Sequence, residues 1–289
     1  MIFQLLIGAL MNGSVYSVVG MGYSLIYKAS GMMSLCQGDM LMMGAFLGLT
    51  FYQILGLPFW LTVLLVSVCM FLLGMLVQSG LISPLLKMGT SYAYIILCTV
   101  AISMVLQNAA MLMWGTRLFR FPSVFSVRTI KVMGAGIAPE QILVLVVAVV
   151  AMLVLHFFMK NTRFGTAMRA AALDDKAASA VGINVPLTKG AAWGISAMLA
   201  GVIGCVLGPV YGVYTTMGVL VGQKAFAGAV TGGYGNMYGA MIGGMFFGFL
   251  EVFVSTAITT AYKDFISFGV LILILIFMPT GILKEQVLE

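Results

Sequence analysis

One stretch of this chain, residues 160–189, reads KNTRFGTAMRAAALDDKAASAVGINVPLTK and is the most polar part of the sequence. Its charged side chains stand among alanines; they are Lys160, Arg163, Arg169, Asp174, Asp175, Lys176 and Lys189. This composition is typical of short helices at an aqueous surface. We call residues 160–189 the polar segment. We expect it to contact a soluble partner, because nearly all of the remaining chain is apolar enough to lie in lipid.

The overall composition predicts a membrane protein. Hydrophobic residues make up 62% of the 289 residues and charged residues only 8%, and the mean hydropathy is +1.13. A soluble domain of this length cannot bury so large an apolar fraction. Apolar runs of roughly 20 residues recur, which is the length that a helix needs to cross a bilayer core of about 30 Å. We therefore predict an all-α, polytopic transmembrane bundle that forms one domain over residues 1–289.

The apolar runs predict about eight full crossings and one half-helix. The crossings cover residues 2–27, 39–55, 58–80, 92–114, 138–158, 188–210, 235–257 and 261–278. The half-helix, re-entrant or otherwise, covers residues 218–230 within a glycine-bounded region at 212–235. The first run is long for a signal peptide and lacks a basic start, so we expect it to be a retained crossing. In the loop at 115–139, the alternation of FRFPSVFSVRTIKV suggests a small β-hairpin.

The net charge of +6 reflects an excess of basic residues, and their distribution among the loops predicts the orientation of the chain. In membrane proteins, basic residues concentrate in cytoplasmic loops. With the polar segment inside, the cytoplasmic side holds that segment's five basic residues together with Lys28, Lys87 and Lys284. The outside holds Arg117, Arg120, Arg128, Lys131 and Lys263. This bias favours an external amino terminus and a cytoplasmic carboxyl terminus. We expect contact with membrane lipid and none with nucleic acid.

Neither enzymatic chemistry nor a metal site is expected. The chain has one histidine, and its cysteines, Cys36, Cys69, Cys98 and Cys205, are scattered without metal-ligand or disulfide spacing. No Ser-His-Asp set can be assembled, and GVLVGQKAF lacks the spacing of a phosphate-binding loop. We expect no cofactor on this chain, so any ATP would be hydrolysed by another subunit.

Two segments at membrane depth break helical regularity: GMMSLCQGD at residues 31–39 and the glycine-rich region at 212–235. Such backbone must be buried in protein or face water, and interruptions in both halves of a chain point to a translocation path. Tight surface loops are the alternative. The candidate path residues are Ser34, Gln37, Gly38, Asp39, Gly218, Lys224, Gly232, Gly233 and Glu251.

Two further features of the crossings concern packing. Glu251 lies well inside a predicted crossing, where a structural hydrogen bond to a neighbouring helix is favoured over a substrate or proton role. Glycines recur four residues apart, which lets helix backbones approach closely and predicts a tightly packed bundle. These sets are Gly190/Gly194, Gly204/Gly208/Gly212, Gly235/Gly239/Gly243 and Gly244/Gly248.

The polar segment resembles the cytoplasmic loop of the branched-chain amino acid permeases of ATP-binding-cassette importers, which runs T-x-F-G-x-A-M-R-A and then A-A-x-x-x-G-I. The matching residues are Thr162, Phe164, Gly165, Ala167, Met168, Arg169, Ala170, Ala177, Ala178, Gly182 and Ile183. The similarity continues through LAGVIGCVLGPVYG, KAFAGAVTGGYGNMYGAMIGG and FMPTGIL, and GSVYSVVGMGYSLIYKASG looks like the family's first span.

The resemblance implies a permease of the bacterial inner membrane that moves branched-chain or other hydrophobic amino acids by alternating access. Its implied partners are a second, generally different permease, two cytoplasmic ATPases that bind ATP and Mg, and an external substrate-binding protein. The polar segment would form coupling helices that receive the motion of the ATPases. Phe164, Met168 and Ile183 would supply apolar contacts, while Arg169, Asp174 and Asp175 would supply polar contacts or helix caps.

One departure from the family keeps other substrates open. Where the family has an N-F-A-H-G-D-like run, this chain reads SLCQGD, with Gly38 and Asp39 kept but Ser34, Cys36 and Gln37 changed. Urea, short amides and other small organic solutes are therefore alternative substrates. A secondary transporter would need an intramembrane ion site, for which Glu251 and Asp39 are the candidates. A channel would need a repeated filter or charged ring, which the sequence does not suggest.

Overall fold

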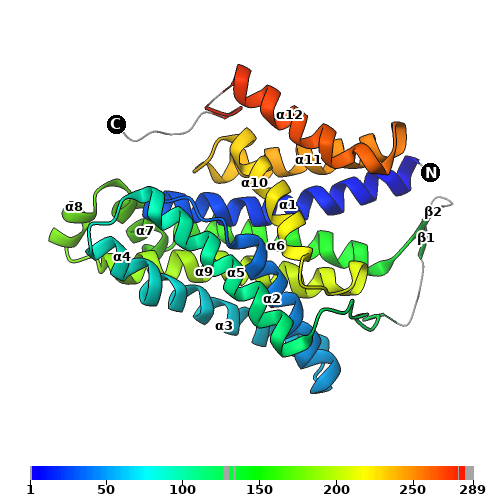
Figure 1. Ribbon diagram of the computed structural model, residues 1–289, viewed down its shortest axis with the longest axis horizontal. Helices are drawn as coiled ribbons and strands as arrows, with labels where there is room; N and C mark the ends of the chain where they lie inside the picture. Colours follow the sequence, from blue (N-terminus) through cyan, green and yellow to red (C-terminus); the bar gives the residue numbers. More distant parts are fainter. Residues whose placement is uncertain (1, 126–129, 133–134, 279, 284–289) are drawn as a thin grey trace.

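The computed structural model describes residues 2–125, 130–132, 135–278 and 280–283, which form a helical bundle elongated along one axis (Figure 1). Two charges used for the orientation prediction, Arg128 and Lys284, lie outside these residues, as does Pro279 of the FMPTGIL motif. In Figure 1, the helices of the polar segment lie at one end of the long axis, and the start of the first helix and a small hairpin lie at the other.

The helices follow the predicted order, with π-helical turns (η1, η2) and a 3₁₀ turn (η3) extending three of them. Their bounds are α1 Ile2–Ser30, α2 Gln37–Leu49, η1 Thr50–Ile54, α3 Phe59–Val77, η2 Gln78–Ile82, α4 Ser83–Lys87, α5 Tyr92–Trp114, α6 Pro139–Asn161, α7 Arg163–Leu173, α8 Asp175–Ala180, α9 Val185–Tyr211, α10 Met217–Gly232, α11 Met237–Ala257, η3 Thr260–Tyr262 and α12 Lys263–Phe277.

The polytopic bundle is confirmed. Seven helical segments among the described residues are long and apolar enough to cross a membrane: Phe3–Ser30, Phe59–Lys87, Tyr92–Trp114, Pro139–Asn161, Val185–Tyr211, Met237–Ala257 and Thr260–Phe277. The remaining predicted crossing, at residues 39–55, corresponds to α2 and η1, and nearly every residue of α2 is buried by its neighbours. The predicted half-helix is α10, whose 16 residues are too few for a full crossing.

Local sequence sets several helix boundaries. Pro139 opens α6, where a missing N–H is tolerated, and the Asn184 side chain caps α9 by accepting a hydrogen bond from the Leu187 N–H at 3.2 Å. Gly212 and Gly233 end α9 and α10 with φ of 77° and 110°, a conformation that glycine adopts without steric penalty. The half-helix is thus separated from both neighbours by glycine-dependent turns.

Glycine contacts build the core, as the four-residue spacing predicted. A Cβ at Gly204 would overlap the Leu41 backbone between α9 and α2, and one at Gly248 would overlap Gly13 between α11 and α1. Gly243 and Gly228 make the same kind of contact between α11 and α10. Because these helices touch through backbone atoms, they leave little room for relative repacking. Gly212 and Gly235, by contrast, lie in turns outside the helices.

The loop between α5 and α6 contains the predicted hairpin. Strands β1 (Ile130–Val132) and β2 (Ala135–Ile137) pair antiparallel, with Ile130 opposite Ile137. The first strand is the end of the FRFPSVFSVRTIKV stretch that predicted the hairpin, and the second strand lies just beyond that stretch. Earlier in this loop, Phe119 and Val213 exchange backbone hydrogen bonds of 2.9 Å, which ties the loop to the turn between α9 and α10.

Candidate functional site

The two interrupted segments predicted to flank a path are in contact. Gly38, in the first turn of α2, packs against Gly218 in the first turn of α10. A Cβ at Gly38 would overlap the Gly218 carbonyl and lie 2.9 Å from the Gly222 Cα. The Tyr23 hydroxyl of α1 also donates to the Gly222 carbonyl at 3.3 Å. Segments at least 180 residues apart in sequence therefore form one junction.

A cavity of about 400 Å³, which we call the groove, lies beside this junction between α2, α5 and α10. Its lining residues with polar groups are Asp39, Ser103, Gln107, Gln223 and Tyr23 of α1. Apolar side chains line the rest; they include Leu35, Val100, Met104, Val219 and Phe226. The groove thus combines one carboxylate with an apolar surface, at the level of the middle of the α5 crossing.

Asp39 is the acidic residue of the groove and is held by two donors from α5. The Gln107 amide donates to Asp39 Oδ1 at 3.0 Å, and the Ser103 hydroxyl donates to Asp39 Oδ2. Ser103 and Gln107 are four residues apart and therefore share one face of α5. An ionised carboxylate has about four acceptor sites, so two donors leave it able to accept further hydrogen bonds from a cationic group. Asp39 itself is only 2% exposed.

A cluster of charges lies on another face of α10. Lys224 Nζ is 2.6 Å from Glu251 Oε1 of α11 and 2.9 Å from Asp264 Oδ1 of α12. Lys263 Nζ lies 2.9 Å from the same Glu251 oxygen, and the Tyr16 hydroxyl donates to Glu251 Oε2 at 2.5 Å. We call these residues the charge cluster. Except for Asp264, they line a second cavity of about 210 Å³. Glu251 is therefore hydrogen-bonded to two neighbouring helices, α1 through Tyr16 and α10 through Lys224.

The other candidate path residues lie away from the groove. Ser34 contacts the Cys36 sulfur at 3.3 Å, and the Gln37 amide donates to the Ser196 carbonyl of α9 at 2.7 Å. Gly232 packs against Gly239, and its carbonyl accepts from the Leu283 N–H at 3.1 Å. Gly233 caps α10. The nine candidates therefore separate into the groove (Gly38, Asp39, Gly218), the charge cluster (Lys224, Glu251) and packing positions (Ser34, Gln37, Gly232, Gly233).

The polar segment forms two capped helices, as its composition predicted. The Thr162 hydroxyl accepts from the Gly165 N–H at 3.0 Å and caps α7. Asp174 caps α8 by accepting from the N–H groups of Lys176 and Ala177 at 2.7 and 3.1 Å. These backbone hydrogen bonds, that of Ala177 first, hold the pKa of Asp174 below its usual range because they stabilise the carboxylate. Asp174 thus has the capping role expected for it.

Internal packing decides which residues of the polar segment face outward. Met168 and Ala178 are buried, so the apolar partner contact expected of Met168 is not available on the surface. Phe164 is partly buried beside Phe158, with ring centroids 6.3 Å apart. Gly165 is also buried, and it packs closely against α6: a Cβ added at Gly165 would lie 2.6 Å from the Phe158 carbonyl oxygen. Ile183 is partly exposed.

The outward face carries other side chains. Leu173, Val181 and Leu187 are large apolar residues that are 62%, 77% and 47% exposed. Arg169 is exposed and donates to the Thr166 hydroxyl at 3.2 Å. Ala177 and Gly182 are exposed as well. The exposed surface of the polar segment thus carries both apolar and basic side chains.

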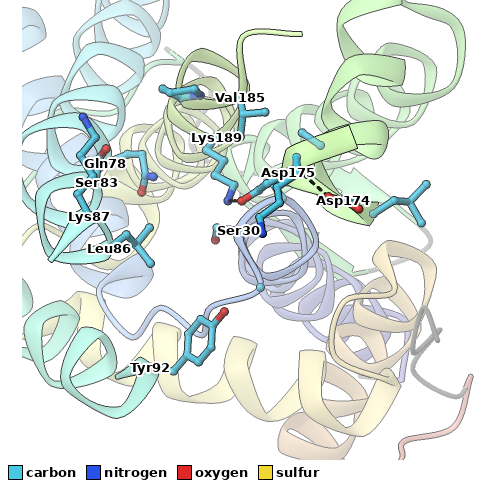
Figure 2. Close-up of a pocket in the computed structure, with 17 residues that line it drawn as sticks. Ser30, Gln78, Ser83, Leu86, Lys87, Tyr92, Asp174, Asp175, Val185 and Lys189 are labelled. Carbon is cyan, nitrogen blue, oxygen red and sulfur yellow. Dashed lines mark hydrogen bonds and ion pairs between the residues drawn. The ribbon is translucent and has the colours of Figure 1, made fainter. Parts of the chain in front are cut away.

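A wide cavity of about 760 Å³, the vestibule, lies between the polar segment and the ends of α1, α4 and α5. Figure 2 shows Gln78, Ser83 and Lys87 on one side of it and the Asp175–Lys189 ion pair on the other. The ion pair spans 2.5 Å and anchors α8 to α9. Because the polar segment forms one wall, any movement of that segment changes the shape of the vestibule.

Several residues of these sites were not identified from the sequence. Ser103 and Gln107 lie inside an apolar crossing, and their four-residue spacing was the signal that could have found them. Lys263 was counted as an external loop charge, but it begins α12 and pairs with Glu251. Within the described part of the chain, no group of three or more His, Cys, Asp and Glu side chains is placed to hold a metal.

Comparison with known proteins gives matches over nearly the whole chain. A family model described as "Branched-chain amino acid transport system / permease component" matches residues 5–275. The permease protein LivH of the high-affinity branched-chain amino acid transport system of Escherichia coli K12 is 33% identical over 290 residues, covering 96% of this chain and 94% of that protein. BraD of Pseudomonas aeruginosa, of the same description, is 33% identical over 300 residues, covering 99% and 97%.

Proposed function

This chain belongs to the branched-chain amino acid transport permease family, and on that premise we propose that it transports branched-chain or other hydrophobic amino acids in an ATP-driven importer. The groove is proposed as this subunit's share of the path. The observation that carries the substrate proposal is that Asp39 and apolar side chains such as Val100, Met104 and Phe226 line the same cavity. A carboxylate attracts the ammonium group of an amino acid, and the apolar surface accommodates an aliphatic side chain.

Urea and short amides fit this lining less well. They carry no positive charge for Asp39 and no aliphatic side chain for the apolar half of the groove. The changes in the SLCQGD run do not favour urea or short amides, because Ser34 and Gln37 do not line the groove. Ser34 contacts the Cys36 sulfur, and Gln37 donates to the Ser196 carbonyl. Three residues of that run line the groove: Gly38 and Asp39, which match the family pattern, and Leu35, which adds to the apolar surface.

A second permease subunit is proposed to cover the groove. Gln223 is exposed at the surface of α10, and Ser103 and Gln107 are partly exposed on α5, all beside the groove. Polar groups at membrane depth are costly against lipid and normally face protein or water. A partner permease placed over α5 and α10 would convert the groove into a closed, water-accessible path.

The polar segment is proposed to contact one of two partner ATPases, which bind ATP and Mg. The exposed Leu173, Val181 and Leu187 provide an apolar surface of the kind that helices insert into protein grooves, and Arg169 adds a charge beside it. Nucleotide-driven closure would then move α7 and α8 as a rigid unit, because both are capped and α8 is tied to α9. An external substrate-binding protein would deliver the solute at the opposite end of the bundle.

The test is transport by the complex purified through a tag on this chain and reconstituted in liposomes with its binding protein. We expect ATP-dependent uptake of labelled leucine that excess isoleucine or valine inhibits and that urea or acetamide does not. ATP-driven uptake of urea without leucine uptake would favour the alternative substrate class. Leucine uptake driven by a proton or sodium gradient in the absence of ATP would instead identify a secondary transporter.

A further inference from the structure

The charge cluster has a property that a single buried ion pair lacks: its two inner members have second partners. Lys224 forms ion pairs with both Glu251 and Asp264, and Glu251 forms ion pairs with both Lys224 and Lys263. The side chains of Lys224 and Glu251 are each only 7% exposed, whereas those of Lys263 and Asp264 are 32% and 47% exposed. The inner pair is therefore buried, and the side chains of its other partners are more exposed.

This arrangement lowers the free-energy cost of separating Lys224 from Glu251. Breaking an isolated buried ion pair leaves two unpaired charges in a low-dielectric environment, which is strongly unfavourable. If Lys224 moves away from Glu251 here, it can keep Asp264, while Glu251 keeps Lys263 and the Tyr16 hydroxyl. The separation then breaks one buried ion pair, but Lys224 and Glu251 each keep a partner of opposite charge.

The helix that carries Lys224 also forms the groove. Gly218, Gly222 and Gln223 of α10 line the groove, while Lys224, one residue further along the helix, points to the cluster. Successive residues of a helix are about 100° apart, so a rotation of α10 that alters the groove also displaces Lys224. Glycines of α10 also contact α2 and α11 through backbone atoms, so a rotation of α10 shifts these contacts together with Lys224.

We propose that Lys224 is the positioning residue of α10, and that Lys263 and Asp264 act as exchange partners that let α10 move during transport. The proposal rests on the transport function proposed above. In the resting arrangement, the Lys224–Glu251 pair sets the rotation of α10 and hence the shape of the groove. During transport, Lys224 shifts toward Asp264 and Lys263 neutralises Glu251.

The deciding variant is Lys263→Met combined with Asp264→Asn, which removes the spare partners and keeps the inner pair. We expect the maximal rate of ATP-driven leucine uptake to fall about tenfold, while the KM for the loaded binding protein stays within about twofold. The melting temperature of the purified complex should remain close to wild type. Thr256→Val is the matched control, because this exposed hydroxyl of α11 bonds only to the carbonyls of Val252 and Phe253 in its own helix.

A second pair of variants tests Lys224 itself. Lys224→Arg keeps the charge and should retain most of the uptake, whereas Lys224→Met should abolish it. Normal uptake by the Lys263→Met/Asp264→Asn protein would overturn the exchange role. A loss of uptake accompanied by a matching loss of thermal stability would also overturn it, because the cluster would then serve only the stability of the fold. If the wild-type complex itself transports no amino acid, the proposed function fails independently of these results.

Discussion

Gly38 and Gly218 pack backbone against backbone, so α2 and α10 meet with no side chain between them. The contact joins the first turn of a buried helix to the first turn of the half-helix and forms the edge of the groove. The groove therefore depends on two residues that contribute no side chain. Their effect is to fix how closely the two helices approach.

Alanine at Gly218 should disturb this junction, because its Cβ would overlap the Gly38 carbonyl. We expect Gly218→Ala to destabilise the protein by about 1–3 kcal/mol, as overpacking does, and to reduce uptake. Thermal unfolding in detergent and uptake in liposomes are the measurements. Gly8→Ala on α1 is the control, because nothing lies within 4 Å of its added Cβ. If both variants behave like wild type, α2 and α10 are not in such close contact.

Asparagine at residue 39 should remove the charge of the groove and keep its size. Asp39→Asn should lower leucine uptake about 10- to 100-fold, which corresponds to losing one hydrogen bond to a charged group. The binding-protein-stimulated ATPase activity is measured beside uptake to show that the complex still assembles. Asn108→Leu is the control on the same helix, because the exposed Asn108 side chain bonds to the Met104 carbonyl of α5 itself. Unchanged uptake by Asp39→Asn would exclude the ammonium-binding role.

Charge on the outward face of the polar segment should uncouple the ATPases. Leu173→Asp with Val181→Asp should lower co-purification of the ATPases about tenfold or more, because it places two carboxylates in an apolar contact. The fold of this chain should be unaffected, since both side chains are exposed. Arg169→Glu should act in the same direction, and Arg117→Glu, an exposed charge reversal in the loop between α5 and α6, is its control for ATPase co-purification. Normal association and uptake by all of these proteins would contradict the coupling role.

The cap at Asp174 should make α8 sensitive to acid. Its pKa is lowered in the folded protein by the N–H groups of Ala177 and Lys176, so its contribution is complete above the unfolded value of about 3.9. That contribution is lost as the pH falls from there through the lowered pKa. The protection of α8 amides against hydrogen exchange, relative to their intrinsic rate at each pH, should therefore fall in this range, and Asp174→Ala should lower it already at neutral pH. Asp174→Asn, which can still cap, should stay close to wild type at neutral pH.

Prediction from sequence succeeded where the signal was local. Apolar runs of membrane-spanning length located the helices, and the glycine-bounded segment at residues 218–230 located α10. The alanine-rich polar segment became two capped helices, because Thr162 and Asp174 each need only their own next turn to act as caps. Four-residue glycine spacing identified close helix contacts, since that spacing places small residues on one face of a helix.

The sites could be predicted only in part, because they depend on which helix faces which. Asp39 was named from the sequence, but its partners Ser103 and Gln107 come from a helix more than 60 residues away. Lys263 looked like a loop charge because nothing in its neighbourhood indicates that α12 folds back toward Glu251. Met168 was expected to face a partner, yet the packing of α7 buries it.

The sequence by itself determined the class of the protein, its crossings and its polar segment, because hydropathy and helix capping are properties of short stretches of chain. Tertiary structure alone decided that Gly38 meets Gly218, that Asp39 is held by α5 and that Lys224 lies between two carboxylates. These relationships join residues from about 27 to 180 positions apart, so they exist only once the helices pack and each helix has a fixed rotation about its own axis.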